Sequence, residues 1–130
     1  MEIDRLDHLV LTVRDIAATC RFYERVLGMR SAEFAPGRWA LHFGGAKLNL
    51  HAADRPVDPN VRHAMPGSAD VCFITRAPVD EVLAELGAAG VPVILGPVRR
   101  IGARGPLLSV YFYDPDENLI EVASEIVEPG

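Results

Sequence analysis

The feature that most constrains this chain is an internal repeat, because a strand–helix–three-strand pattern occurs twice. The elements of the first copy are predicted at 6–13 (strand), 16–27 (helix) and about 29–34, 39–43 and 47–52 (strands). Those of the second copy are predicted at 69–75 (strand), from Pro78 (helix) and at about 92–98, 107–113 and 119–123 (strands). Internal repeats constrain architecture more firmly than local propensities do. We therefore predict an α+β fold built from two βαβββ modules.

The segment 54–67 joins the two copies and contains Pro56, Pro59 and Pro66. We interpret it as a linker within a single domain of residues 1–130, because neither module, at about 4–53 and about 68–125, is long enough for a comfortable core by itself.

Residue-level matches support the repeat. The stretch His8-Leu-Val-Leu-Thr-Val matches Asp70-Val-Cys-Phe-Ile-Thr. The stretch Lys47-Leu-Asn-Leu-His also matches Asn118-Leu-Ile-Glu-Val, and we place Asn49 opposite Glu121. Local signals mark the ends of the first helix. Asp15 is predicted as its N-cap, and Gly28 follows its last turn, where a left-handed backbone conformation commonly ends a helix.

Strand alternation assigns six polar or reactive side chains to the sheet faces that do not pack on the helices. They are His8, Asn49, His51, Asp70, Cys72 and Glu121. Glu121 lies in an otherwise apolar strand. An unpaired buried carboxylate is costly, so Glu121 must be exposed, protonated, paired or bound to a metal.

Composition narrows the possible partners. Hydrophobic content of 49% and charged content of 24% are ordinary for a globular protein. The net charge of −5 argues against nucleic acid and anionic membranes as partners. No apolar run approaches the roughly 20 residues that span a bilayer, and the charged N-terminus is not typical of a signal peptide. Cys20 and Cys72 suit reduced thiols, so we expect a cytoplasmic protein without a disulfide.

Three segments together resemble the vicinal oxygen chelate superfamily, which includes glyoxalase I, extradiol dioxygenases, fosfomycin-resistance thiol transferases and bleomycin-binding proteins. These segments are Leu-Asp-His8-Leu-Val-Leu-Thr-Val-Arg-Asp, Phe22-Tyr23 with Leu27-Gly28-Met29, and Asp-Pro-Asp-Glu-Asn-Leu-Ile-Glu121-Val. Within the superfamily, Leu-His-Phe-Gly-Gly-Ala-Lys-Leu-Asn-Leu-His51 and the segment from Gly96 to Pro106 resemble the subgroup of glyoxalase domain-containing proteins similar to glyoxalase domain-containing protein 5.

The resemblance implies a divalent metal, zinc, iron, manganese, nickel or cobalt, held at the first and last strands of each half. The matching positions are His8, Asn49, Asp70 and Glu121. Asn49 stands where glutamate is frequent and Asp70 where histidine is frequent. We predict that His8, Glu121 and at least one of His51 and Asp70 bind the metal, with Glu121 also a catalytic base if it is displaced. The resemblance further implies a homodimer.

Other residues are candidates for substrate binding. Asn49 and Cys72 would line a groove, and Arg99, Arg100 and Arg104 lie in a glycine-rich stretch that we predict as a loop, where guanidinium groups would hold an anionic substrate group. A solvated basic loop and a hydrogen-bonded strand histidine are the structural alternatives. We predict a metal-dependent lyase, isomerase or dioxygenase acting on a small oxygen-rich substrate. The alternatives are a metal-free protein that sequesters an antibiotic of the bleomycin type and an inert scaffold.

Overall fold

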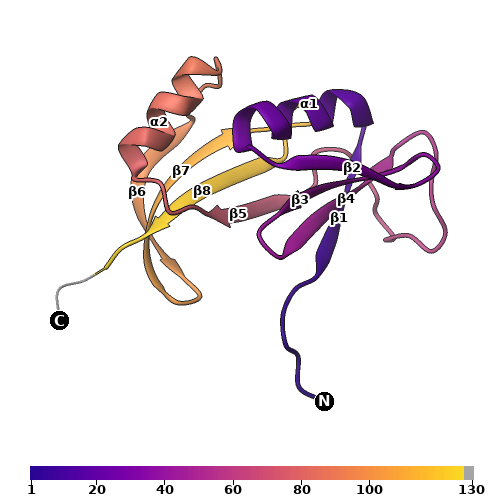
Figure 1. Cartoon of the computed structure of the whole chain (residues 1–130), viewed down its shortest axis with the longest axis horizontal. Helices are drawn as coiled ribbons and strands as arrows, with labels where there is room; N and C mark the ends of the chain where they lie inside the picture. Colours follow the sequence, from indigo (N-terminus) through magenta and orange to yellow (C-terminus); the bar gives the residue numbers. More distant parts are fainter. Residues whose placement is uncertain (128–130) are drawn as a thin grey trace. The chain divides into compact units, whose positions relative to one another are not determined.

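The computed structural model of the chain describes residues 1–127, which form two compact units, Met1–Ala69 and the described part of Asp70–Gly130. Each unit contains one four-stranded sheet and one helix (Figure 1). The elements occur in the predicted order, so the predicted α+β fold of two βαβββ modules is confirmed.

The first unit consists of β1 (His8–Val13), α1 (Ile16–Leu27), β2 (Arg30–Ala35), β3 (Arg38–Phe43) and β4 (Ala46–Ala52). Its strands lie in the order β1-β4-β3-β2. The first and last strands pair in parallel, and the other neighbours pair antiparallel.

The second unit consists of β5 (Asp70–Ile74), α2 (Val79–Ala88), β6 (Leu95–Gly102), β7 (Gly105–Tyr113) and β8 (Leu119–Glu125). Its strand order, β5-β8-β7-β6, repeats that of the first unit, and again the first and last strands pair in parallel. Between Ala52 and Asp70 the chain forms neither helix nor strand.

Local signals fix the ends of α1 as predicted. The Asp15 carboxylate accepts a hydrogen bond from the backbone N–H of Ala18 at 3.0 Å, which satisfies one of the donors that a helix start leaves without a partner. Gly28 has φ 64°, a left-handed conformation that closes the other end of the helix.

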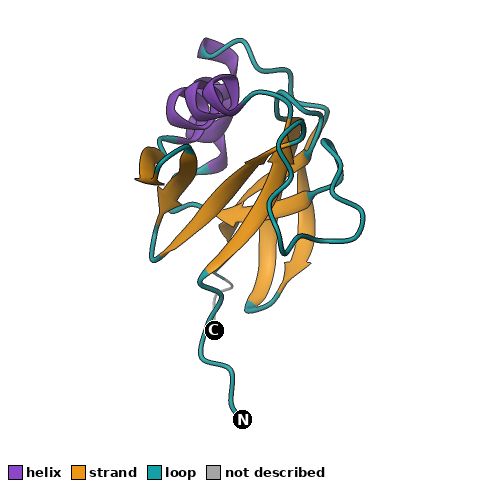
Figure 2. Ribbon diagram, turned by 90° about the vertical axis from the view of Figure 1, so that its right-hand side faces the viewer, coloured by secondary structure: helices purple, strands orange, loops and turns teal. Residues whose placement is uncertain are grey.

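In each unit the helix packs against its own sheet, α1 against β2, β3 and β4 and α2 against β7 and β8. Figure 2 colours the helices purple and the strands orange. The core beneath α1 includes Tyr23, Leu41 and Leu48, and the buried face beneath α2 includes Val110, Phe112 and Ile120. Apolar burial of this kind stabilises a fold by roughly 25 cal/mol per Å² removed from water. No helix within residues 1–127 has the length and hydropathy needed to cross a membrane.

Two predictions about local structure were wrong. The strand predicted at about 92–98 begins at Leu95 and continues to Gly102, so Arg99 and Arg100 lie in β6 and not in a loop. Gly102 pairs directly with Gly105 across a tight hairpin, so the predicted glycine-rich loop is a two-residue turn at Ala103 and Arg104. The glycines of this segment indicated a loop, but pairing with the apolar residues of β7 extends β6 through it.

The strand registers also correct the alignment of the two repeats. His8 pairs with Lys47, and Asp70 pairs with Leu119. If His8 corresponds to Asp70, then Lys47 corresponds to Leu119 and Asn49 to Glu121. The letter-by-letter match of 47–51 with 118–122 is therefore off by one residue, although the predicted correspondence of Asn49 and Glu121 holds.

Gly96 provides a test of the β6–β7 register. It has φ 117°, and a Cβ at this position would lie 2.5 Å from the carbonyl oxygen of Ser109. We expect Gly96→Ala to lower the free energy of unfolding by about 2 kcal/mol or more, because both the backbone conformation and the contact are unfavourable for alanine. Gly45→Ala is the matched control, because nothing lies within 4 Å of a Cβ there. Urea unfolding measures both, and equal stability of the two variants would contradict the described register.

Candidate functional site

In the first unit, three of the predicted site residues share one face of the sheet. In the parallel β1–β4 pair, His8 lies beside Lys47, while Val10 lies beside Asn49 and Thr12 beside His51. The opposite face carries Ser31, whose hydroxyl donates a hydrogen bond to the Glu24 carboxylate of α1. His8, Asn49 and His51 therefore lie on the face turned away from α1, as strand alternation predicted.

The second unit repeats this arrangement. Cys72 of β5 and Tyr111 of β7 are the register partners of Glu121 on either side of it. Asp70 lies two residues before Cys72 and so shares its face. Ser124 lies on the other face of β8 and donates a hydrogen bond to the Ala77 carbonyl just before α2, at 2.7 Å. Asp70, Cys72 and Glu121 therefore lie on the face turned away from α2.

Glu121 is half-buried and has a dedicated partner. The hydroxyl of the fully buried Ser109 donates a hydrogen bond of 2.6 Å to its Oε2 atom. From the sequence, Glu121 was expected to be exposed, protonated, paired or bound to a metal, and the structure provides a buried hydroxyl donor. Charge-assisted hydrogen bonds of this kind are about twice as strong as neutral ones.

Glu121 also acts on the neighbouring thiol. Burial raises the pKa of Cys72, and the negative charge and hydrogen bonding of Glu121, followed by the charge of Asp70, raise it further, to about 11. The residue still has an exposed surface. A thiol that stays protonated at neutral pH suits a side chain that lines a site better than it suits a nucleophile.

The three candidate arginines occupy different positions. Arg100 shares the Glu121 face through its pairing with Leu107, and its Nε donates to the Tyr111 hydroxyl at 3.0 Å. Arg99 pairs with Leu108, so it lies on the other face of the sheet. Arg104 forms an ion pair with Glu125 at 3.4 Å. Arg100 is thus held on the same face as Glu121, and Arg99 is not.

Asn49 and His51 are buried polar residues, only 7% and 8% exposed. The Oδ1 atom of Asn49 and the Nδ1 atom of His51 have no hydrogen-bond partner within the described residues. Burial lowers the pKa of His51, the positive charge of Arg38 lowers it further, and a side-chain hydrogen bond with Asn60 acts in the opposite direction. Because buried polar groups without partners are uncommon, these two atoms are candidates for contact with a ligand.

His8 is exposed and lies at the start of β1. Its Nδ1 lies 2.7 Å from a carboxylate oxygen of Asp7, and this hydrogen bond holds the pKa of Asp7 below its usual value. A histidine that binds a metal through one ring nitrogen commonly donates from the other to a carboxylate. The Asp7–His8 pair has the chemistry of that arrangement.

Within residues 1–127, no three His, Cys, Asp or Glu side chains gather into a group that could hold a metal ion. The predicted ligands are divided between the two units, His8 and His51 in the first and Asp70 and Glu121 in the second. The donor chemistry nevertheless fits a divalent cation, since imidazole and carboxylate groups are present and Asn49 has an unpartnered buried oxygen. The predicted set of metal ligands therefore stays a prediction.

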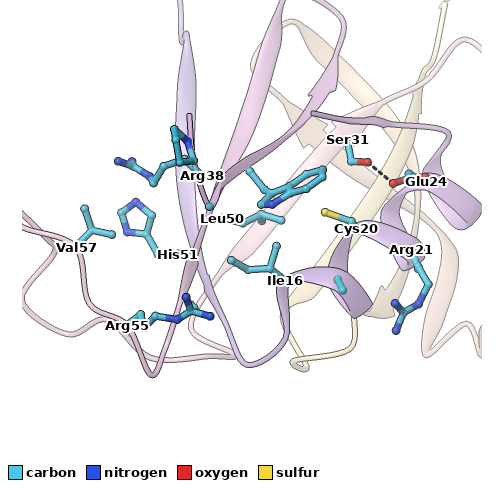
Figure 3. Close-up of a pocket in the computed structure, with 15 residues that line it drawn as sticks. Ile16, Cys20, Arg21, Glu24, Ser31, Arg38, Leu50, His51, Arg55 and Val57 are labelled. Atoms are coloured by element: carbon cyan, nitrogen blue, oxygen red, sulfur yellow. Dashed lines mark hydrogen bonds between the residues drawn. The ribbon is translucent and has the colours of Figure 1, made fainter. Parts of the chain in front are cut away.

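The first unit also contains a cavity of about 620 Å³ that sequence analysis did not predict (Figure 3). One face of α1, the β2–β3 hairpin, the end of β4 and the segment just after it form its walls. The residues that line it include Arg21, Arg38, Trp39, Leu50, His51 and Arg55. They come from four separate stretches of sequence, so no single motif could have identified the cavity.

A family comparison defines the class of the protein. Residues 5–122 match the model of the Glyoxalase/Bleomycin resistance protein/Dioxygenase superfamily. The match covers most of the chain, and the chain belongs to this superfamily.

Two relatives align with nearly the whole chain. Virulence protein STM3117 of Salmonella typhimurium is 49% identical over 126 residues, 97% of this chain and 88% of that protein. Its crystal structure superposes with a TM-score of 0.95 over 97% of this chain and all of that one. Glyoxalase domain-containing protein RDO1 of Mycosarcoma maydis is 44% identical over 95% of this chain and 70% of that protein.

More distant structures share the fold. Lactoylglutathione lyase from Agrobacterium tumefaciens is 25% identical over 95% of both chains, with a TM-score of 0.73. The fosfomycin resistance protein FosX from Listeria monocytogenes, solved with Mn(II) and sulfate, is 22% identical over 98% of this chain and 94% of that one, with a TM-score of 0.68. The similarity to FosX is evidence for the fold alone.

The raised pKa of Cys72 gives a prediction about reactivity. In a Cys20→Ser background, alkylation of Cys72 by iodoacetamide at pH 9.0 should be roughly 50-fold slower than for a thiol with a pKa of 9.0, since only the thiolate reacts. Glu121→Gln should speed the reaction, because it removes the negative charge beside the thiol. Mass spectrometry over time measures both rates. Glu85→Gln on α2 is the control, and an unchanged rate in Glu121→Gln would contradict the described contact.

Proposed function

We propose that this protein is a metal-dependent enzyme, a lyase, isomerase or dioxygenase, that acts on a small oxygen-rich substrate. The observation that carries the proposal is the correspondence of Asn49 with Glu121 and of His8 with Asp70, on the sheet faces turned away from the helices. Polar and ligating side chains thus occupy matching places in both modules. Superfamily membership supports this class of activity.

In this proposal His8, Asp70 and Glu121 hold a divalent cation. When bound, the metal would supply Lewis-acid chemistry for adjacent substrate oxygens. The Ser109 hydroxyl orients the Glu121 carboxylate, which would act as the base that accepts a substrate proton. Asn49 hydrogen-bonds the substrate, and Arg100 holds an anionic substrate group.

Of the two alternatives for a further ligand, the surroundings favour Asp70 over His51. The guanidinium of Arg38 is close enough to His51 to lower the pKa of its imidazole. The same positive charge opposes a divalent cation at that imidazole. Asp70 instead adds a negative charge to the Glu121 face.

Three finer predictions belong with this proposal. The similarity to RDO1, itself named a glyoxalase domain-containing protein, supports placement in the subgroup similar to glyoxalase domain-containing protein 5. Homodimer formation and a cytoplasmic location stay predictions.

The alternative is metal-free binding of an antibiotic. The superfamily description names a bleomycin resistance protein, and the net charge of −5 would favour a cationic drug. Calorimetric titration of metal-depleted protein with bleomycin separates the two proposals. Micromolar or tighter binding without metal would support sequestration.

Metal binding tests the enzyme proposal. We expect protein purified without chelators to contain a stoichiometric divalent metal by elemental analysis. His8→Ala and Glu121→Gln should each weaken its affinity by at least about tenfold, because each removes a donor. His63→Ala and Glu85→Gln are matched controls at exposed positions outside the proposed set. Absence of metal in the parent protein, or equal metal binding in all four variants, would contradict the proposal.

A further inference from the structure

The cavity of the first unit has two chemically different ends joined by an apolar wall (Figure 3). Arg38, His51 and Arg55 lie at one end, and Arg21 and Glu24 lie at the other. Between them, the lining includes Ile16, Trp39 and Leu50. Trp39 and Leu50 lie on the α1 face of the sheet and Arg38 and His51 on the other, so the cavity extends around the ends of β3 and β4. Ligand pockets commonly have about 300–1,000 Å³ of volume, an apolar lining and a few polar groups, and this cavity of about 620 Å³ has these properties.

The charge of the cavity is opposite to that of the chain. Its lining contains three arginines, Arg21, Arg38 and Arg55, and one acidic residue, Glu24, a formal balance of +2 with His51 neutral. The whole chain carries −5. Glu24 already accepts a hydrogen bond from Ser31 at the far end. The positive end therefore lacks a carboxylate among the residues that line it.

Two buried nitrogen atoms at the positive end lack a hydrogen-bond partner within the described residues. The Nε atom of Arg38 and the Nδ1 atom of His51 are buried and make no hydrogen bond within the described residues. His51 is more than nine-tenths buried. Both atoms are covered by protein, so a ligand in the cavity would reach these two side chains through their other nitrogen atoms.

We propose that this cavity binds a small organic anion, a carboxylate attached to an apolar chain or ring. The carboxylate accepts hydrogen bonds at the Arg38 and His51 end, and Arg55 adds positive charge. The apolar part packs against Ile16, Trp39 and Leu50. Because the apolar wall is extensive, a bare inorganic anion would leave most of the cavity unfilled. This inference does not rest on the proposed metal-dependent activity.

Trp39 provides the readout, because it is the only tryptophan of the chain and lines the cavity. Octanoate is the probe, below its micelle-forming concentration, and Trp39 emission is recorded during titration. We expect saturable binding of octanoate. Octyltrimethylammonium has the same chain with the opposite charge and should bind at least about tenfold more weakly. Inorganic phosphate should compete poorly, because it lacks the apolar part.

Three variants locate the site. Arg38→Gln should weaken octanoate binding by roughly tenfold or more, and Arg38→Lys should lie between it and the parent protein. Ala17→Phe keeps every charge but adds a ring at an exposed helix position of the lining, so it should also abolish binding. Arg30→Gln removes an exposed β2 charge outside the lining and is the matched control, which should bind as the parent does.

Outcomes of the experiment are distinct. Absence of octanoate binding, equal binding of octyltrimethylammonium, or unchanged binding in both Arg38→Gln and Ala17→Phe would each overturn the proposal. Glu121→Gln should bind octanoate as the parent does, whether or not it loses metal. A failure of the anion cavity is therefore distinguishable from a failure of the proposed metal site.

Discussion

The parallel pairing of the first and last strand in each module is the constraint on which the rest of the structure depends. It places His8 beside Lys47 and Cys72 beside Glu121, which are distant in sequence. Parallel strands cannot be joined by a tight turn, so a helix and two further strands must form the connection. The helix then covers one face of the sheet and leaves the other face for polar side chains.

The cost of burying these polar groups explains much of their local environment. Glu121 accepts a hydrogen bond from a fully buried hydroxyl, and its charge in turn raises the pKa of Cys72. At the corresponding place in the first module, the Oδ1 atom of Asn49 has no partner. Neighbouring His51 has a cationic neighbour in Arg38, so the end of β4 suits an anion better than a metal. One repeated architecture thus provides different chemistry in its two copies.

Sequence patterns predicted those features that depend on near neighbours or on strict alternation. Asp15 and Gly28 marked the ends of α1, and alternation assigned Asn49 and Glu121 to the faces away from the helices. Pairing across strands was not predictable from one segment, so the Ser109 partner of Glu121 and the strand position of Arg100 were missed. The cavity around Trp39 was missed because its walls come from four stretches of sequence.

The central proposal is that Glu121 binds a divalent metal, and paramagnetic broadening of amide NMR signals by Mn(II) tests it most directly. We expect a small amount of Mn(II), added to metal-depleted protein, to broaden signals near Glu121. Glu121→Gln should abolish this broadening, because it removes the charged donor. No broadening near Glu121, or broadening retained in Glu121→Gln, would contradict the account.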